Sequence, residues 1–207
     1  MFKIKKVIFG IIIVILILLI AFIFFKTEYK GTYLGNNISE IDILNISSYE
    51  ATVEVSVISN KNQNKYIMKQ KYKKENIFKQ EILEPSALKG LTITSDGNMV
   101  TIENKILDLK NVYENLGGNI SNLNLVSFIQ NYKNGEKNET FETEEAIIMK
   151  TEIKDSKNKY QMYQNLYLDK KTNLPTKMEI LDINKNVTVY ILYREINVNR
   201  LKDSDMV

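Results

Sequence analysis

The sequence contains no histidine, no cysteine and no tryptophan among its 207 residues. Without histidine, the chain cannot build a Ser-His-Asp triad, a Cys-His pair or a metal site with imidazole ligands. Without cysteine it has no disulfide framework, no thiol chemistry and no lipobox residue to carry a lipid anchor. No GxxxxGK[ST] or GxGxxG phosphate loop occurs either. These absences exclude the commonest routes to hydrolytic and nucleotide-dependent catalysis.

A pair of carboxylates remains formally possible, because a glycosidase-type mechanism needs only two. Glu142, Glu144 and Glu145 form the acidic cluster, but this stretch is rich in Thr and Glu and lacks apolar neighbours that would raise a carboxyl pKa. The cluster also lacks the spacing of a calcium-binding loop. We therefore predict no catalytic residue, no cofactor and no metal site, and we expect that the protein is not an enzyme.

Residues 7–25, VIFGIIIVILILLIAFIFF, are the longest apolar run, and seventeen of the nineteen are Ile, Leu, Val or Phe. A helix of this length spans roughly 28 Å, which is close to the ~30 Å hydrocarbon core of a bilayer. Each of these side chains favours insertion by roughly 0.3 to 0.6 kcal/mol, and no charged residue opposes it. The run therefore predicts a transmembrane helix.

The same run is longer than the roughly 7 to 15 apolar residues of a secretory signal, and its bulky end, FIFF, is unlike an A-x-A cleavage site. We therefore predict an uncleaved signal-anchor in the cell membrane, with a removed signal as the alternative. Lys3, Lys5 and Lys6 precede the run and favour a cytoplasmic N-terminus. The predicted parts are a cytoplasmic tail (1–6), the anchor (7–25), a linker (26–38) and an extracytoplasmic domain (39–207).

The formal net charge of +3 comes from the flanks of this run. Residues 1–30 hold five Lys and one Glu, whereas the remainder holds 23 basic and 24 acidic residues, a net charge of −1. The charges of the remainder are interspersed, which argues against a nucleic-acid partner. Lys outnumbers Arg 26 to 2, which is typical of an AT-rich genome such as that of a Gram-positive bacterium.

Beyond the linker, where Ser39 is a candidate helix cap, apolar residues alternate with polar ones. In residues 48–58, for example, Tyr49, Ala51 and Val53 share one face. Most connections are short polar segments, and Asp96-Gly97 is a hairpin signal, so neighbouring strands should pair antiparallel. We predict an α+β fold: a curved, mainly antiparallel sheet of about nine to eleven strands packed on one or two helices, preceded by the transmembrane helix.

One segment has helical periodicity instead. Leu125, Phe128, Ile129 and Tyr132 follow the i, i+3, i+4, i+7 spacing of an amphipathic helix, which Ser121 would cap and Gly135 would follow. The apolar stripe of this helix should lie on the sheet.

The strand over residues 187–198 is apolar on both faces at first, with Val189, Ile191 and Tyr193 on one face and Tyr190, Leu192 and Ile196 on the other. Burial on both faces predicts a central strand. The sheet then encloses either packed side chains or a cavity.

Three stretches carry a resemblance to a known family: YEATVEVSV, KYIMKQKYKKENIFKQEILEPSALKGLTITSDGN and YLDKKTNLPTKMEI. Together with the order of strands and helix, they resemble the GerS-like germination lipoproteins, which have a LolA-like lipoprotein-carrier fold. The resemblance covers roughly residues 45–200 and contains no catalytic signature. It implies an exported, membrane-tethered protein that binds a cell-wall amidase in spore cortex processing or germination. The absence of a lipobox cysteine departs from this pattern, so the transmembrane helix would replace the lipid tether.

Three functions are therefore weighed: a tethered module that binds an extracytoplasmic protein such as a cell-wall amidase, a LolA-type carrier or sensor that holds an acyl chain or lipid, and a carboxylate-dependent hydrolase. The lack of histidine and of any motif disfavours the hydrolase. Tyr163 and Tyr167 share one strand face and are the candidate partner-binding residues, because amphipathic rings suit a protein interface. Packing of these two rings under a helix is the alternative.

Overall fold

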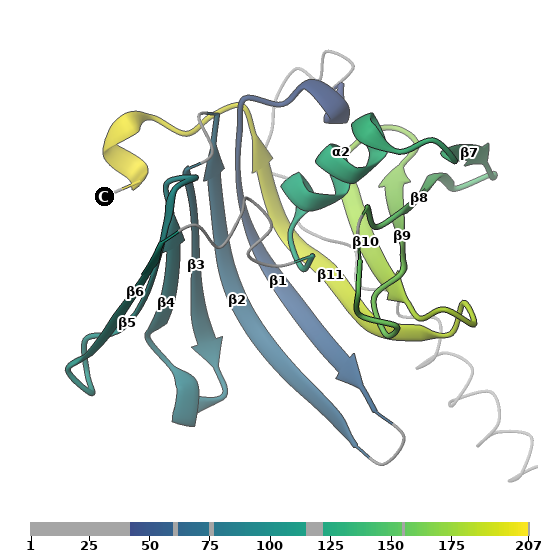
Figure 1. Cartoon of the computed structure of the whole chain (residues 1–207). Coiled ribbons are helices and arrows are strands. Elements are labelled where there is room, and N and C mark those ends of the chain that lie inside the picture. Colours follow the sequence, from purple (N-terminus) through teal and green to yellow (C-terminus); the bar gives the residue numbers. More distant parts are fainter. Residues whose placement is uncertain (1–41, 60–61, 75–76, 115–121, 155, 207) are drawn as a thin grey trace, which may run out of the picture. The chain divides into compact units, whose positions relative to one another are not determined.

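The computed structural model describes residues 42–206, apart from 60–61, 75–76, 115–121 and 155. These residues form one sheet of eleven antiparallel strands, with the order β6-β5-β4-β3-β2-β1-β11-β10-β9-β8-β7 (Figure 1). The strands are β1 (Ser48–Ile58), β2 (Gln63–Lys73), β3 (Ile77–Glu84), β4 (Leu91–Ser95), β5 (Met99–Asn104), β6 (Leu109–Glu114), β7 (Glu139–Glu142), β8 (Ala146–Glu152), β9 (Tyr163–Asp169), β10 (Pro175–Leu181) and β11 (Val187–Val198). The helical elements are α2 (Leu125–Asn134) and the short 3-10 turns η1 (Ile43–Asn45), η2 (Ser86–Leu88) and η3 (Asp203–Met206). The predicted mainly antiparallel α+β architecture is confirmed.

The sheet consists of two meanders that meet at its centre. Strands β1 to β6 follow one another outward to one edge, and β7 to β11 follow one another inward from the other edge. The first strand pairs with the last, from Tyr49 opposite Val198 to Val57 opposite Val189. The predicted central position of β11 is therefore confirmed.

One face of the sheet carries α2 and is called the helix face; the opposite one is called the open face (Figure 1). Tyr49, Ala51, Val53 and Val55 of β1 are buried on the helix face, as their alternation predicts. Leu166, Met178 and Ile191 of the neighbouring strands continue the same core, to which α2 adds its apolar stripe.

The face predicted for Ile196 was wrong because of a β-bulge. Thr52 pairs with Glu195 but Val53 pairs with Tyr193, so the β11 backbone contains one extra residue at this point. A bulge of this kind reverses the alternation of faces beyond it. Ile196 is therefore buried in the core with Tyr193, whereas Tyr190 and Leu192 are half-buried on the open face.

Helix α2 has the predicted apolar stripe, and Leu125 and Phe128 are fully buried. Its N-cap is Asn124, whose side-chain oxygen accepts a hydrogen bond of 2.8 Å from the Ser127 backbone N–H. The predicted cap, Ser121, lies outside the described residues. Gly135 follows the last turn, as predicted. Near the start of the domain, Asp42 caps the turn η1, and the predicted cap Ser39 also lies outside the described residues.

The sequence analysis missed β6 and β7, the two edge strands of the sheet. Every residue of both strands is exposed. A strand with no buried face has no reason to alternate apolar and polar residues, so periodicity does not reveal it. The acidic stretch that includes Glu142 is thus partly the edge strand β7.

No helix in the described part of the chain is long and apolar enough to cross a membrane. The predicted cytoplasmic tail, signal-anchor and linker lie outside that part.

Replacement of Phe128 by Asp should lower the free energy of unfolding by more than about 3 kcal/mol, because it places an unpaired charge in the core beneath α2. The neighbouring Gln130 points away from this stripe and is only half-buried, so Gln130→Asp is the matched control and should be nearly silent. Urea unfolding of both variants measures the difference. Equal losses of stability would contradict the assigned helix face.

Candidate functional site

Tyr163 and Tyr167 lie on the open face of β9, with Asn165 between them. The intervening residues Gln164 and Leu166 are fully buried on the helix face. Because successive side chains of a strand point to opposite faces, α2 does not cover the two tyrosines. The described structure therefore does not place them under α2, and both rings are half-buried.

The Glu179 carboxylate on the adjacent strand β10 organises the surroundings of Tyr167. The Tyr167 hydroxyl donates a 2.9 Å hydrogen bond to Glu179 Oε2, and Asn165 Nδ2 donates a second one of 3.2 Å. Lys177 Nζ lies 3.0 Å from Glu179 Oε1 and 4.0 Å from the centroid of the Tyr167 ring. Only 7% of Glu179 is exposed, and both oxygens of its carboxylate have partners. The hydrogen bond from Tyr167 to this carboxylate orients the Tyr167 ring.

The same environment changes the acidity of Tyr167. Burial, followed by the hydrogen bond to Glu179 and the negative charge of that carboxylate, raises the pKa of Tyr167 from 10.0 to about 12. Each cause disfavours the phenolate. Tyr167 is therefore a neutral hydrogen-bond donor at physiological pH.

Further apolar side chains extend this surface across four strands. Tyr190 lies opposite Glu179, Leu192 lies opposite Lys177, and Ile148 lies opposite Tyr167. At the sheet edge, Lys150 Nζ lies 4.6 Å from the ring centroid of Phe141. The term tyrosine face denotes Tyr163, Tyr167 and Tyr190 with the side chains between them. Aromatic rings are enriched at protein–protein interfaces, so the three tyrosines make this face a candidate interface.

A second buried acid continues the open face toward the sheet centre. Glu54 of β1 lies opposite Leu192, accepts a hydrogen bond from Arg194 and lies 3.4 Å from Lys65 Nζ. Burial alone would raise the pKa of the Glu54 carboxyl, but Arg194 and then Lys65 lower the pKa below its ordinary value. Two paired carboxylates therefore lie in the β1–β11–β10 region of an otherwise open face.

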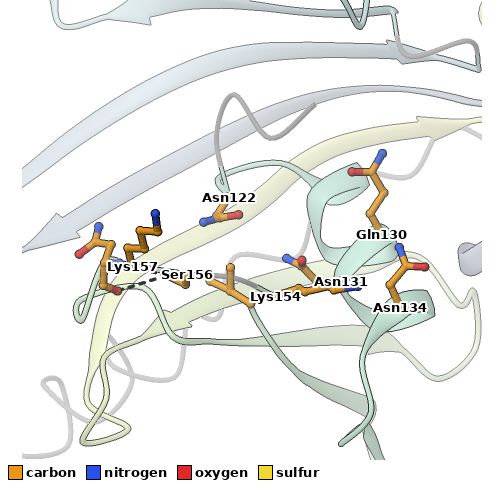
Figure 2. Close-up of a pocket in the computed structure, with 9 residues that line it drawn as sticks. Asn122, Gln130, Asn131, Asn134, Lys154, Ser156 and Lys157 are labelled. Carbon is orange, nitrogen blue, oxygen red and sulfur yellow. Dashed lines mark hydrogen bonds between the residues drawn. The ribbon is translucent and has the colours of Figure 1, made fainter. Parts of the chain in front are cut away.

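A pocket of about 610 Å³ lies beside α2 (Figure 2). The helix contributes the amide side chains of Gln130, Asn131 and Asn134, and the segment after β8 contributes Lys154 and Lys157. The lining is mainly polar, with Ile153 as its apolar member. The polar side chains of this wall can form hydrogen bonds with a ligand.

Two fully buried glutamines, which the sequence analysis did not single out as functional, hold the start of α2 on the sheet. Gln70 Nε2 donates to the Leu123 carbonyl oxygen at 2.9 Å, and Gln164 Nε2 donates to the Asn122 carbonyl oxygen at 3.0 Å. Gln164 Oε1 also accepts from Asn131 Nδ2 of the helix. In a sequence, a glutamine among the apolar residues of one strand face indicates such a contact, because a buried side-chain amide needs a hydrogen-bond partner.

The acidic stretch predicted to be inert is solvated in the structure. Glu142, Glu144 and Glu145 are exposed, and Glu142 Oε2 lies 3.0 Å from Lys170 Nζ. Within the described ranges, no group of three or more acidic side chains is placed to hold a metal ion.

Substitution of Glu179 by Gln should lower the pKa of Tyr167 from about 12 toward its ordinary value of 10.0, because the charge that opposes the phenolate is lost. Ultraviolet difference titration against the Tyr167→Phe variant isolates this one ring. Because the pKa is higher in the folded state, this ring's contribution to stability is complete below pH 10 and is lost as the pH rises toward 12.

Glu50 of β1 also lies on the open face, and its carboxylate is paired with Lys69. The substitution Glu50→Gln therefore serves as the control for a general effect of removing a negative charge. A Tyr167 pKa that does not move in Glu179→Gln, or moves equally in Glu50→Gln, would contradict the assigned hydrogen bond.

Solved structures contain chains that are similar to this one. A chain in the structure of the CwlD amidase from Clostridioides difficile in complex with the GerS lipoprotein is 26% identical over 78% of this chain and 97% of that chain, with a TM-score of 0.51. An uncharacterised conserved protein from Thermus thermophilus is 13% identical over 79% of this chain and 85% of that chain, with a TM-score of 0.50. A LolA superfamily protein from Nitrosomonas europaea is 11% identical over 81% and 92% of the two chains, with a TM-score of 0.43.

The first of these likenesses supports the GerS-like fold that the sequence resemblance predicts. No curated protein matches the chain in sequence. The family model described as sporulation protein YdcC-like matches residues 4–206. Since this match covers nearly the whole sequence, the chain belongs to the YdcC-like family of sporulation proteins.

Proposed function

We propose that this protein is a membrane-tethered, extracytoplasmic binding protein that engages a cell-wall amidase in spore cortex processing or germination. The tyrosine face is the observation that carries the proposal. The Tyr167 ring at its centre is held by a hydrogen bond to Glu179, so this side chain loses few conformations when a partner binds. Tyr is also among the residues that contribute most to binding energy at interfaces.

The likeness to a chain of the CwlD–GerS complex supports an amidase as the partner class. In that structure the lipoprotein is bound to the amidase. The stretch YLDKKTNLPTKMEI, one of those that carry the sequence resemblance to GerS-like proteins, runs from the end of β9 through most of β10 and contains both Tyr167 and Glu179. The chain has no cysteine for lipid attachment, so the apolar run over residues 7–25 would provide the tether.

We further propose that the protein has no catalytic activity of its own. A hydrolase at neutral pH needs a base poised near pH 7, and histidine, the usual one, is missing from the sequence. A carboxylate in that role would have to be desolvated and free of a cation. Glu54 and Glu179 are buried, but each is paired with basic side chains, and the Glu142 stretch is solvated.

A LolA-type carrier of an acyl chain is the alternative, and the described residues favour the binding module over it. A carrier needs an apolar cavity of several hundred Å³. On the helix face, Tyr49, Leu125 and Phe128 are fully buried and fill the space beneath α2. The 610 Å³ pocket beside the helix has a mainly polar wall.

Replacement of both Tyr163 and Tyr167 by Ala should weaken binding of the organism's own cell-wall amidase by about 30-fold or more, the loss expected for truncated aromatic hot spots. Isothermal calorimetry with the purified amidase measures the dissociation constant.

Peptidoglycan turnover should require the amidase, because this chain alone offers no general base.

Tyr113→Ala on β6 is the matched control, because Tyr113 is an exposed tyrosine on a strand remote from β9 in the sheet order. Thermal unfolding of all variants separates loss of binding from loss of folding. Amidase binding that survives the double substitution, or that falls equally in Tyr113→Ala, would contradict the proposed surface. Turnover of peptidoglycan by the chain alone would contradict the non-catalytic role.

The full-length chain should stay in the membrane fraction after washing with alkaline carbonate, because the residue 7–25 run favours insertion by several kcal/mol. Immunoblotting of the pellet and the supernatant distinguishes the outcomes. A soluble form that begins after residue 25 would show instead that the run is a removed signal.

A further inference from the structure

Strand β6 (Leu109–Glu114) forms one edge of the sheet (Figure 1). All six of its side chains are exposed, including Leu109 at 56%, Val112 at 52% and Tyr113 at 43%. The backbone N–H and C=O groups on the outer side of an edge strand are available to another strand. Within the described ranges, β5 is the one strand that pairs with β6.

The side chains of β6 divide between the two faces of the sheet. Tyr113 lies opposite Val100, which is buried on the helix face, so Leu109, Asn111 and Tyr113 point to that side. Lys110, Val112 and Glu114 therefore point to the open face. Along this face the order is positive, apolar, negative.

We propose that β6 pairs antiparallel with β6 of a second copy of this chain, about a two-fold axis at Val112. In this register Val112 faces Val112 of the other copy. Lys110 faces Glu114 of the other copy, and Glu114 faces its Lys110. The contact is therefore self-complementary, with one ion pair on each side of the central apolar pair.

The charges select this register among its neighbours. A two-fold axis at Lys110 or at Glu114 places like charges directly opposite each other. An axis at Asn111 or at Tyr113 leaves a charged side chain opposite Val112. Only the axis at Val112 pairs each charge of β6 with its opposite, and cross-strand pairs of opposite charge stabilise a sheet whereas like charges destabilise it.

The arrangement also accounts for the exposed apolar side chains of β6. On the helix face, Tyr113 comes to lie opposite Asn111 of the other copy, and the second strand covers part of the surface of Val112. Because each copy uses its β6 edge once, the assembly closes at two chains. The other edge, β7, has four residues and no such charge order, ETFE.

Single cysteines test the register, because the native chain has none. Directly opposite Cα atoms in an antiparallel pair are about 4.5 or 5.5 Å apart, within disulfide range, so Val112→Cys should form a covalent dimer on mild oxidation. Lys110→Cys is the matched control, because its two copies would be offset by four residues, about 13 Å. The double variant Lys110→Cys/Glu114→Cys should cross-link again.

Non-reducing gels of the purified full-length chain measure the dimer, and about tenfold more is expected for Val112→Cys than for Lys110→Cys, since only the former satisfies disulfide geometry. In the Val112→Cys background, Glu114→Lys should reduce cross-linking, because it places lysines opposite one another. Thermal unfolding checks that this exposed substitution leaves the fold intact. Equal cross-linking at positions 110 and 112, or none at position 112, would overturn the proposal.

Discussion

The antiparallel ladder between β1 and β11 is the interaction on which the rest of the structure depends. It joins the first strand to the last, and so links two meanders that would otherwise have separate cores. The shared core lies across this ladder, with Val53 of β1 and Ile191 of β11 in one cluster with Phe128 of α2. Because the ladder joins distant parts of the chain, its loop-closure entropy must be offset by this burial and by the hydrogen bonds of a long strand pair.

The same ladder determines how the two faces of the sheet are used. On the helix face, α2 buries its stripe over the core, and Gln70 and Gln164 bond to the segment that leads into the helix. On the open face, the two buried carboxylates Glu54 and Glu179 are each surrounded by cations or hydrogen-bond donors. In the described part of the chain, these contacts hold side chains of the open face in place on the side of the sheet opposite α2, and a preorganised binding surface requires such positioning.

The two edges of the sheet differ in a way that bears on association. Strand β7 is short and acidic. Charge lies along it, because Glu142 is paired with Lys170 and Lys150 lies over the Phe141 ring. Charged side chains at a sheet edge discourage pairing with other strands. Strand β6 is longer and carries exposed apolar side chains between charges of opposite sign. A sheet that protects one edge and leaves the other open favours a single, defined mode of self-association.

The sequence by itself determined the elements that have a buried face. Tyr49, Ala51 and Val53 alternate because one side of β1 is buried, and Leu125, Phe128 and Ile129 recur at helical spacing because one side of α2 is buried. It also determined that Tyr163 and Tyr167 share a strand face and that histidine and thiol chemistry are excluded. Burial leaves a periodic record in the chain, and composition limits the available chemistry.

Only the tertiary structure decided which distant strands are paired and which face is covered. The edge strands β6 and β7 escaped detection because no buried face imposes alternation on them. The bulge opposite Thr52 and Val53 moved Ile196 into the core, against the strict period-2 expectation. The pairing of Glu54 with Arg194, and that of Tyr167 with Glu179, depends on the order and register of strands. Register is set by the packing of the whole sheet, because a slip of one residue would exchange every side chain between its two faces.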